Sequence, residues 1–305
     1  MSYGDYFSIL NSPSPPFPKL LPPKMSLGIV VKGTEGVVLA ADSRVSVGAR
    51  RRLPDGSEQQ FNVDFDNTNK LIYFSSDSHQ HVGVITYGQA LIGQRTPFSY
   101  KPEIELKLPD ERVSVERYSE ILYDFYQDAW NHQQMPSAEA WEGPPITFIV
   151  SGYDPDSAYG RTYQFSIPGD NPPEEQQEEE FGMSWGGETQ IVTRLIKGFD
   201  PGLIGALQTQ GDFDNEELET VLEQASQNVS YSIPYEVLPL QDCVNLAILM
   251  IRTTIDLQGL AIGPRGVGGK IEVATITRTE GLDFIQKKQL RGESALGGDY
   301  DDQHG

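Results

Sequence analysis

The stretch from Ser26 to Arg44, SLGIVVKGTEGVVLAADSR, constrains the fold more than any other part of the chain. Two β-branched, apolar runs flank a short segment that contains Gly33 and Gly36. Glycine supplies the positive φ that a tight hairpin turn needs, so the pattern predicts a β-hairpin. Asp42 and Arg44 close the second run. Because side chains alternate along a strand, these two residues are expected to share a face and to orient other polar groups.

This hairpin resembles the first hairpin of proteasome β-subunits and their bacterial relatives, the N-terminal-nucleophile hydrolases, and suggests a divergent bacterial-type member. The run GVVLAADSR carries the likeness. The resemblance implies a mature chain that begins with a nucleophilic hydroxyl residue. Aligned without gaps, that position falls on Ser26, directly after Met25. A free α-amine, with a pKa of about 7.7 to 8.0, can take the proton of the hydroxyl on its own residue.

Ser26 has a free amine only once residues 1–25 are removed. Six prolines in this segment exclude a helix or a central strand and predict an extended arm, either a propeptide or a disordered tail. Self-cleavage after Met25, or translation from Met25 followed by removal of that methionine, would expose Ser26. A second alignment, with a hairpin two residues longer, puts Lys24 at the nucleophile position and implies an inactive protein.

The resemblance also implies roles for a lysine and a glycine that follow the hairpin. Lys70 is the second residue of the run NKLIYF, at a position where the family has a lysine whose charge tunes the nucleophile. Gly88 ends the alternating run 81–87, where the family has a glycine whose amide helps to form the oxyanion hole. Asp42 and Arg44 would order the site.

The resemblance returns in GGKIEVATITRTEG, residues 268–281, which is similar to the last strands of the proteasome fold. Just before it the family has an aspartate and a serine that support the nucleophile's amine, whereas this chain has Pro264 and Val267. A further family serine falls on Gly186 or Gly187. The nearby polar candidates are Glu188 and Thr189. These departures weaken the prediction of activity.

The fold class implied is α+β, a four-layer αββα sandwich of two antiparallel sheets covered by helices on both outer faces. We expect one domain over 26–290, a proline-rich arm over 1–25 and a disordered tail over 291–305. Insertions relative to the family are expected near 45–68, as a hairpin, and near 168–182 and 200–240.

Local patterns place the remaining elements. Pro97 and Pro102 shorten or displace the helix that the family has after Gly88. Ser114 can cap a helix that runs to about His132. Strands are expected at 147–153 and 159–167, and a solvated acidic loop at 174–180. One helix should end at Lys197, and another should span 241–257. Between them, Asp214 and Glu217 form a capping box for a helix with an apolar face of Leu218, Val221, Leu222 and Ala225.

Composition limits the partners and the compartment. The net charge of -21 opposes binding to nucleic acid. The single cysteine, Cys243, permits no internal disulfide and fits a reducing cytoplasm. We expect no membrane span and no signal peptide. His79 and His81 are expected on one strand face without further ligands, so neither a metal nor another cofactor is expected.

Three functions follow from the resemblance. The first is a proteasome-type peptidase that acts on peptide or protein substrates within a homo-oligomer or a ring of related subunits. Such a ring allows an ATP-dependent unfoldase as a partner. The second is a catalytically inactive structural or regulatory subunit of the same fold. The third is an amidohydrolase on small amides, because one nucleophile serves several chemistries on related folds.

Overall fold

The computed structural model describes residues 26–290 except 54, 179, 201, 204–206 and 208–214. Two five-stranded antiparallel sheets form its centre, in the orders β10-β1-β2-β11-β12 and β5-β6-β7-β8-β9. The first sheet contains β1 (Leu27–Lys32), β2 (Val37–Ala41), β10 (Gly182–Gly187), β11 (Glu272–Thr277) and β12 (Gly281–Gln286). The second contains β5 (Leu71–Tyr73), β6 (Val82–Gly88), β7 (Ile146–Gly152), β8 (Arg161–Ile167) and β9 (Glu174–Glu175).

The predicted hairpin lies in the middle of the first sheet. Strand β1 pairs with β2 in the register Gly28 with Ala41, and Gly33 donates its amide to the carbonyl oxygen of Gly36 in the turn. Every residue of β1 and β2 is buried. Both faces of this hairpin are therefore covered, which explains why its apolar runs are continuous rather than alternating.

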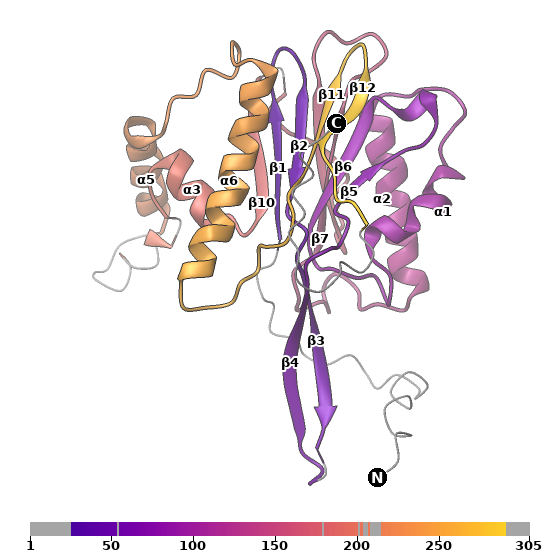
Figure 1. Ribbon diagram of the computed structural model, residues 1–305, viewed down its shortest axis with the longest axis vertical. Coiled ribbons are helices and arrows are strands. Elements are labelled where there is room, and N and C mark those ends of the chain that lie inside the picture. The colour runs from indigo at the N-terminus through magenta and orange to yellow at the C-terminus, as the bar shows by residue number, and fades with distance from the viewer. Residues whose placement is uncertain are drawn as a thin grey trace, which may run out of the picture.

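Helices cover the outer sides of the two sheets (Figure 1). Helix α2 (Val115–His132) packs on the second sheet through buried aromatic residues that include Tyr126 and Trp130. Helices α3 (Gln190–Lys197) and α6 (Leu240–Leu260) contribute to a core on the first sheet. A third core joins the sheets, with Leu39 and Ile85 among its members. The structure also describes the helices α1 (Lys101–Glu105) and α5 (Asn215–Val229).

Residues 45–65 form a separate two-stranded hairpin of β3 (Val45–Arg52) and β4 (Glu58–Phe65). It extends away from the body, at the bottom of Figure 1, and we refer to it as the arm. A hairpin predicted in this part of the chain is thus confirmed.

Other local predictions are also confirmed. Helix α2 begins after Ser114, whose hydroxyl accepts a hydrogen bond of 3.2 Å from the amide of Arg117. After Gly88 the chain makes only a short 3₁₀ turn, Pro97–Tyr100, and the five-residue α1. The helix in this region is therefore short, as expected, and Pro97 and Pro102 each lie in the first turn of one of these elements, where proline is tolerated.

Three predictions need correction. His79 ends a 3₁₀ turn and is buried beside Tyr118, while His81 precedes β6, so the two histidines do not share a strand face. Strand β9 and the ion pair of Glu175 with Arg161 lie within the stretch predicted as a solvated acidic loop. In α5, Leu218 is buried but Val221 is 59% exposed, so the predicted apolar face is only partly covered. The capping residue Asp214, the proline-rich segment 1–25 and the tail 291–305 lie outside the described residues.

Helix α6 is long and apolar enough to cross a membrane by length and composition, contrary to the expectation of no such stretch. A core helix of a globular domain meets the same criterion. One face of α6 packs into the core of the first sheet through residues that include Cys243, Ala247 and Ile251, while Leu249 and Leu257 are largely exposed. We therefore interpret α6 as a core helix that leaves an apolar outer face.

The burial of Cys243 gives a direct test of this packing. The thiol is fully buried next to Gly33 in the β1–β2 turn, and burial raises its pKa to about 11. At pH 8 the native protein should therefore react with a thiol reagent far more slowly than the unfolded chain, because only the thiolate reacts. Ellman's assay with and without denaturant measures this. Rapid, stoichiometric labelling of the native protein would contradict the packing of α6 against the hairpin.

Candidate active site

Asp42 is the centre of a buried polar cluster at the end of β2. Its Oδ1 atom accepts hydrogen bonds from the Leu27 amide at 2.9 Å and from Lys70 Nζ at 2.5 Å. Its Oδ2 atom accepts from the amides of Arg44 and Gly268, both at 3.0 Å. The Asp42 side chain has no exposed surface. Four donors around one carboxylate satisfy a buried negative charge, which would otherwise be costly to bury.

Lys70 reaches this cluster from the opposite sheet, because it directly precedes β5. Its side chain is 6% exposed, and Asp42 is its ion-pair partner. Burial lowers the pKa of Lys70, and the positive charge of Lys288 lowers it further, while Asp42 acts in the opposite direction. Lys288 is itself held in a buried ion pair with Glu272, at 3.2 Å. A lysine with a lowered pKa is typical of functional sites.

Ser26 lies at the start of β1, next to the residue whose amide binds Asp42. It is 4% exposed. Its amide donates to the carbonyl oxygen of Gly266 at 3.0 Å, and its carbonyl oxygen accepts from the amide of Glu188 at 2.8 Å. The φ angle of Ser26 is 82°, a conformation that costs a non-glycine residue about 1 to 2 kcal/mol. Cleavage before Ser26 would remove this φ angle, and the strain with it.

Two glycines of β10 make room beside Ser26. A Cβ atom on Gly187, which has a φ of 95°, would lie 2.1 Å from the Ser26 carbonyl oxygen. A Cβ atom on Gly186 would lie 2.0 Å from the ring of Tyr87, and Gly28 also packs against this ring. Burial raises the pKa of Tyr87 to about 12, so its hydroxyl stays protonated near neutral pH. Tyr87 thus fills the space between the two sheets close to Ser26.

Arg44 contributes to the site through its backbone rather than its side chain. Its guanidinium forms two hydrogen bonds with Asp66, at 2.5 and 2.8 Å, and a third with the carbonyl oxygen of Arg265 at 3.1 Å. The hydrogen bond to Arg44 holds the pKa of Asp66 below its ordinary value. Of Arg44, only the backbone amide binds Asp42, so the side chain instead fixes the root of the arm against the segment before β11.

Of the other predicted site residues, only Glu188 contacts Ser26, through its backbone amide. Thr189 precedes α3, and its carbonyl oxygen accepts a hydrogen bond from the amide of Thr193. Gly88 ends β6 with a φ of 92°, and a Cβ atom there would lie 2.1 Å from the carbonyl oxygen of Pro145. This position therefore requires glycine, and Gly88 directly follows Tyr87.

The segment 266–269 was missed as part of the site. The carbonyl oxygen of Gly266 and the amide of Gly268 bind Ser26 and Asp42, and a Cβ atom on Gly268 would lie 2.5 Å from the Arg44 guanidinium. Val267, by contrast, is buried, and its amide binds Gln258. The signal was the run GVGG, because consecutive glycines often mark close approach of two backbones.

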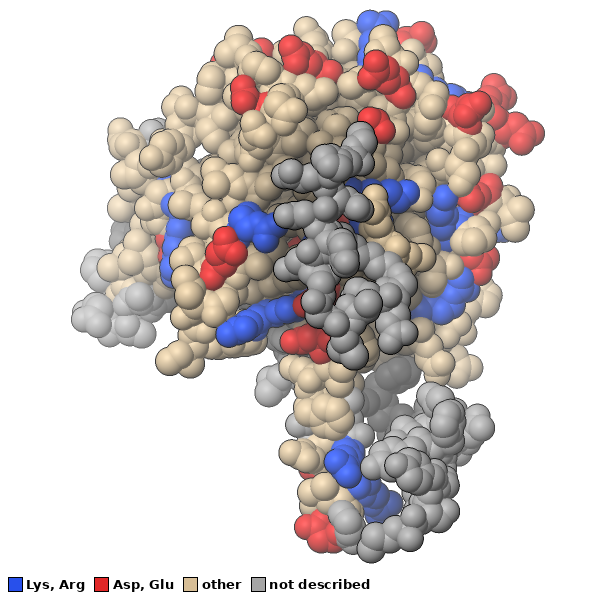
Figure 2. All heavy atoms as spheres, in the orientation of Figure 1, with Lys and Arg blue, Asp and Glu red and all other residues tan. Residues whose placement is uncertain are grey.

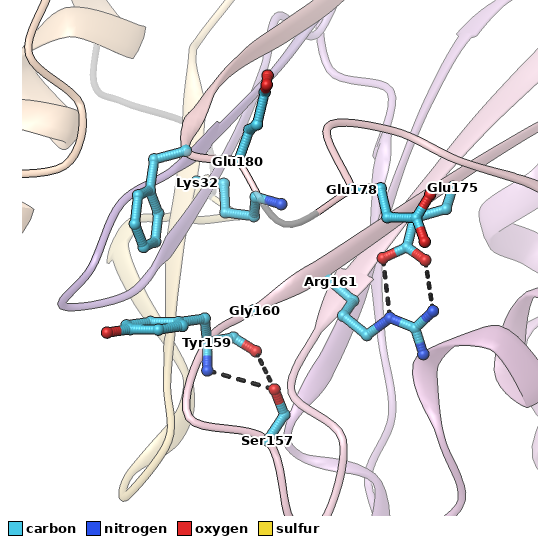
Figure 3. A pocket seen from close by; sticks show the side chains of 9 residues that line it. Lys32, Ser157, Tyr159, Gly160, Arg161, Glu175, Glu178 and Glu180 are labelled. Carbon is cyan, nitrogen blue, oxygen red and sulfur yellow. Dashed lines mark hydrogen bonds and ion pairs between the residues drawn. The ribbon is translucent and has the colours of Figure 1, made fainter.

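A separate cavity of about 280 Å³ lies at the opposite end of β1 (Figure 3). Lys32, the last residue of β1, lines it together with Tyr159, Arg161, Glu175 and Glu180. Arg161 is paired with Glu175, and Lys32 donates to the carbonyl oxygen of Gln177. Lys32 is the last residue of β1, and Ser26 directly precedes the first, so this cavity is distinct from the cluster around Asp42.

Comparison with known proteins identifies the fold. No protein-family model matches the sequence, and no curated protein matches it either. Among solved structures, a (Gly-1) mutant of Anbu from Hyphomicrobium sp. strain MC1 matches with a TM-score of 0.50 and 15% identity, over 86% of each chain. Anbu from Yersinia bercovieri, described as an ancestral beta-subunit, matches with a TM-score of 0.50 and 13% identity, over 86% of this chain and 87% of that one. The chain therefore has a proteasome-like fold of mixed helices and antiparallel sheets.

Proposed function

We propose that the chain is a proteasome-like peptidase of the N-terminal-nucleophile type, with Ser26 as its nucleophile. The observation that carries the proposal is the buried ion pair of Asp42 and Lys70, at 2.5 Å, next to the first residue of β1. Ser26 directly precedes Leu27, whose amide binds Asp42, and this closeness supports the gapless alignment. The alternative alignment selects Lys24, which lies outside the described part of the chain.

In this proposal each group has a defined task. Removal of residues 1–25 converts the Ser26 amide into a primary amine, which still donates to the carbonyl oxygen of Gly266. The amine takes the proton of the Ser26 hydroxyl as the oxygen attacks the substrate carbonyl. The ammonium of Lys70 favours the unprotonated amine and the developing alkoxide by its positive charge. Asp42 holds that ammonium in place, and the Gly88 amide would stabilise the oxyanion.

The same proposal covers architecture and partners. We propose that the two sheets and their outer helices form the four-layer αββα sandwich of the proteasome subunit. On this basis the chain would assemble with copies of itself or with related subunits in the cytoplasm, where an unfoldase can supply protein substrates. The likeness to Anbu supports oligomeric assembly in general terms.

Intact mass and N-terminal sequencing of the protein expressed from Met1 test the nucleophile. We expect a mature chain that begins at Ser26, and hydrolysis of a fluorogenic peptide pool. Ser26→Thr should keep both properties, because threonine supplies the same hydroxyl. Ser26→Ala should lower hydrolysis by at least about 10³-fold, since it removes the nucleophile. The same measurements on protein expressed from Met25 distinguish self-cleavage from removal of an initiator methionine.

One result would favour the inactive alternative instead. If both starts give a chain with Ser26 free but no hydrolysis or covalent adduct with a peptidyl boronate, the site lacks a working nucleophile. Pro264 and Val267, which stand where the family has an aspartate and a serine, are the sequence reason to keep this alternative. Hydrolysis of small amides without cleavage of peptides would instead indicate the amidohydrolase.

A further inference from the structure

The arm has one apolar face that is buried at its root, where Val45 is 7% exposed, and that carries two exposed phenylalanines. Its strands pair in a register that places Val45 opposite Phe65 and Val47 opposite Val63, and these side chains lie on one face because side chains alternate along a strand. Phe61 falls on the same face, two residues before Val63. The opposite face carries polar pairs such as Ser46 with Asp64 and Gly48 with Asn62.

Beyond Val45, this face stays partly open in the single chain, because Val47 and Val63 are half-buried. Phe61 is 43% exposed and Phe65 is 56% exposed. Within the described residues, β3 and β4 pair only with each other, and neither phenylalanine belongs to the hydrophobic cores. An isolated two-stranded hairpin is only marginally stable in water. A hairpin that projects into solvent with exposed phenylalanines on one face therefore indicates a surface that another chain covers.

We propose that the occupant is the arm of a second copy, packed face to face and antiparallel. The two-fold axis lies between the two apolar faces and runs across the strands at the level of Val47 and Val63. Val63 then meets Val63 of the other copy, and Phe61 meets its Phe65. Self-complementarity of this kind is what an isologous contact requires. Paired phenylalanines add an aromatic contact at both ends of the face.

The charges of the arm and of the body favour a second arm as the partner and an antiparallel arrangement. The arm carries three arginines and three acidic residues between 45 and 65, so it is formally neutral, while the whole chain carries -21. Two copies thus meet with least repulsion through their arms. The antiparallel arrangement keeps the acidic bodies at opposite ends. It also brings Arg51 and Arg52, both exposed near the tip, towards Asp64 and Asp66 at the root of the other arm. Figure 2 shows basic side chains on the part of the arm that projects from the body.

The contact alone is small. Eight residues per strand at about 3.3 Å each give a face roughly 26 Å long, and two strands make it about 10 Å wide. Each copy would bury about 300 Å², well below the roughly 800 Å² per partner of a stable interface. The arms are therefore expected to associate weakly when they act alone and to reinforce other contacts in an assembly.

Disulfide trapping in the full chain tests this pairing without any need for enzymatic activity, so it can succeed or fail independently of the proposed peptidase. The native Cys243 is buried and does not compete. We expect Val63→Cys to form a covalent dimer under mild oxidation at tens of micromolar protein. The matched control Asn62→Cys lies on the opposite face of the same strand, and Ser57→Cys lies beyond the tip. Neither should cross-link.

A second set of variants ties the trapping to the apolar face. Phe61→Ser with Phe65→Ser, added to Val63→Cys, should lower the yield of dimer about tenfold or more, since buried aromatic residues dominate small interfaces. Both phenylalanines are largely exposed, so thermal unfolding should change little. No dimer with Val63→Cys, equal dimer with Asn62→Cys, or dimer through Ser57→Cys would each overturn the antiparallel pairing.

Discussion

Asp42→Ala is expected to lower the free energy of unfolding by about 3 to 5 kcal/mol, the cost of leaving a buried lysine without its partner. Among the described residues, the only ion pair of Lys70 is with Asp42, and its side chain is 6% exposed. The amides of Leu27, Arg44 and Gly268 lose their acceptor as well. For a chain of this size the loss corresponds to a fall in Tm on the order of 10 °C. Calorimetry and urea titration measure it.

Lys70→Met provides the matched comparison, because it removes the other half of the same pair. The Asp42 carboxylate would keep its three amide donors, and methionine fills much of the volume of the lysine stem. We therefore expect a loss clearly smaller than that of Asp42→Ala. Adding Lys70→Met to Asp42→Ala should recover part of the stability, since no unpaired charge is left buried. Equal losses in the two single variants would show that Asp42 is not the hub of the cluster.

Most of the fold was accessible from the sequence because its local signals agree with one another. The glycine turn of the β1–β2 hairpin and the Ser114 cap of α2 each act over a few residues and have their expected effect, and the helix after Gly88 is short as predicted. His79 shows where local reading fails. An alternating pattern suggested a strand, but burial against Tyr118 holds this histidine in a 3₁₀ turn.

The candidate site was also predicted only in part. Asp42 and Lys70 were predicted together through a family resemblance, and the structure brings their side chains into contact from two different sheets. Their catalytic roles stay predictions. The Arg44 side chain was expected at the same point but binds Asp66 instead, because the arm places that carboxylate beside it. Gly266 and Gly268 act through backbone atoms, which a search for polar side chains does not detect.

Gly187→Ala is expected to disturb Ser26 more than any other change of a single methyl group near the site. The added Cβ would lie 2.1 Å from the Ser26 carbonyl oxygen, and an alanine must also adopt a φ near 95°. Because the new Cβ atom clashes with a main-chain oxygen rather than with a flexible side chain, one of the two strands must move. We expect a loss of about 2 to 4 kcal/mol in unfolding free energy, from the φ penalty and the overpacking together. Displacement of Ser26 by about 1 Å should also slow its chemistry by roughly 10²-fold.

Gly186→Ala is the neighbouring control that separates a backbone clash from a side-chain clash. Its added Cβ meets the ring of Tyr87 rather than a main chain. Adding Tyr87→Leu to Gly186→Ala should therefore restore much of the lost stability, whereas the same addition to Gly187→Ala should restore none. Urea titration of these four variants, of Tyr87→Leu alone and of the unmodified protein, together with the rate of Ser26-dependent hydrolysis, completes the two double-mutant cycles. Rescue of Gly187→Ala by Tyr87→Leu would mean that Ser26 is positioned by packing between the sheets, and not by direct backbone contact with β10.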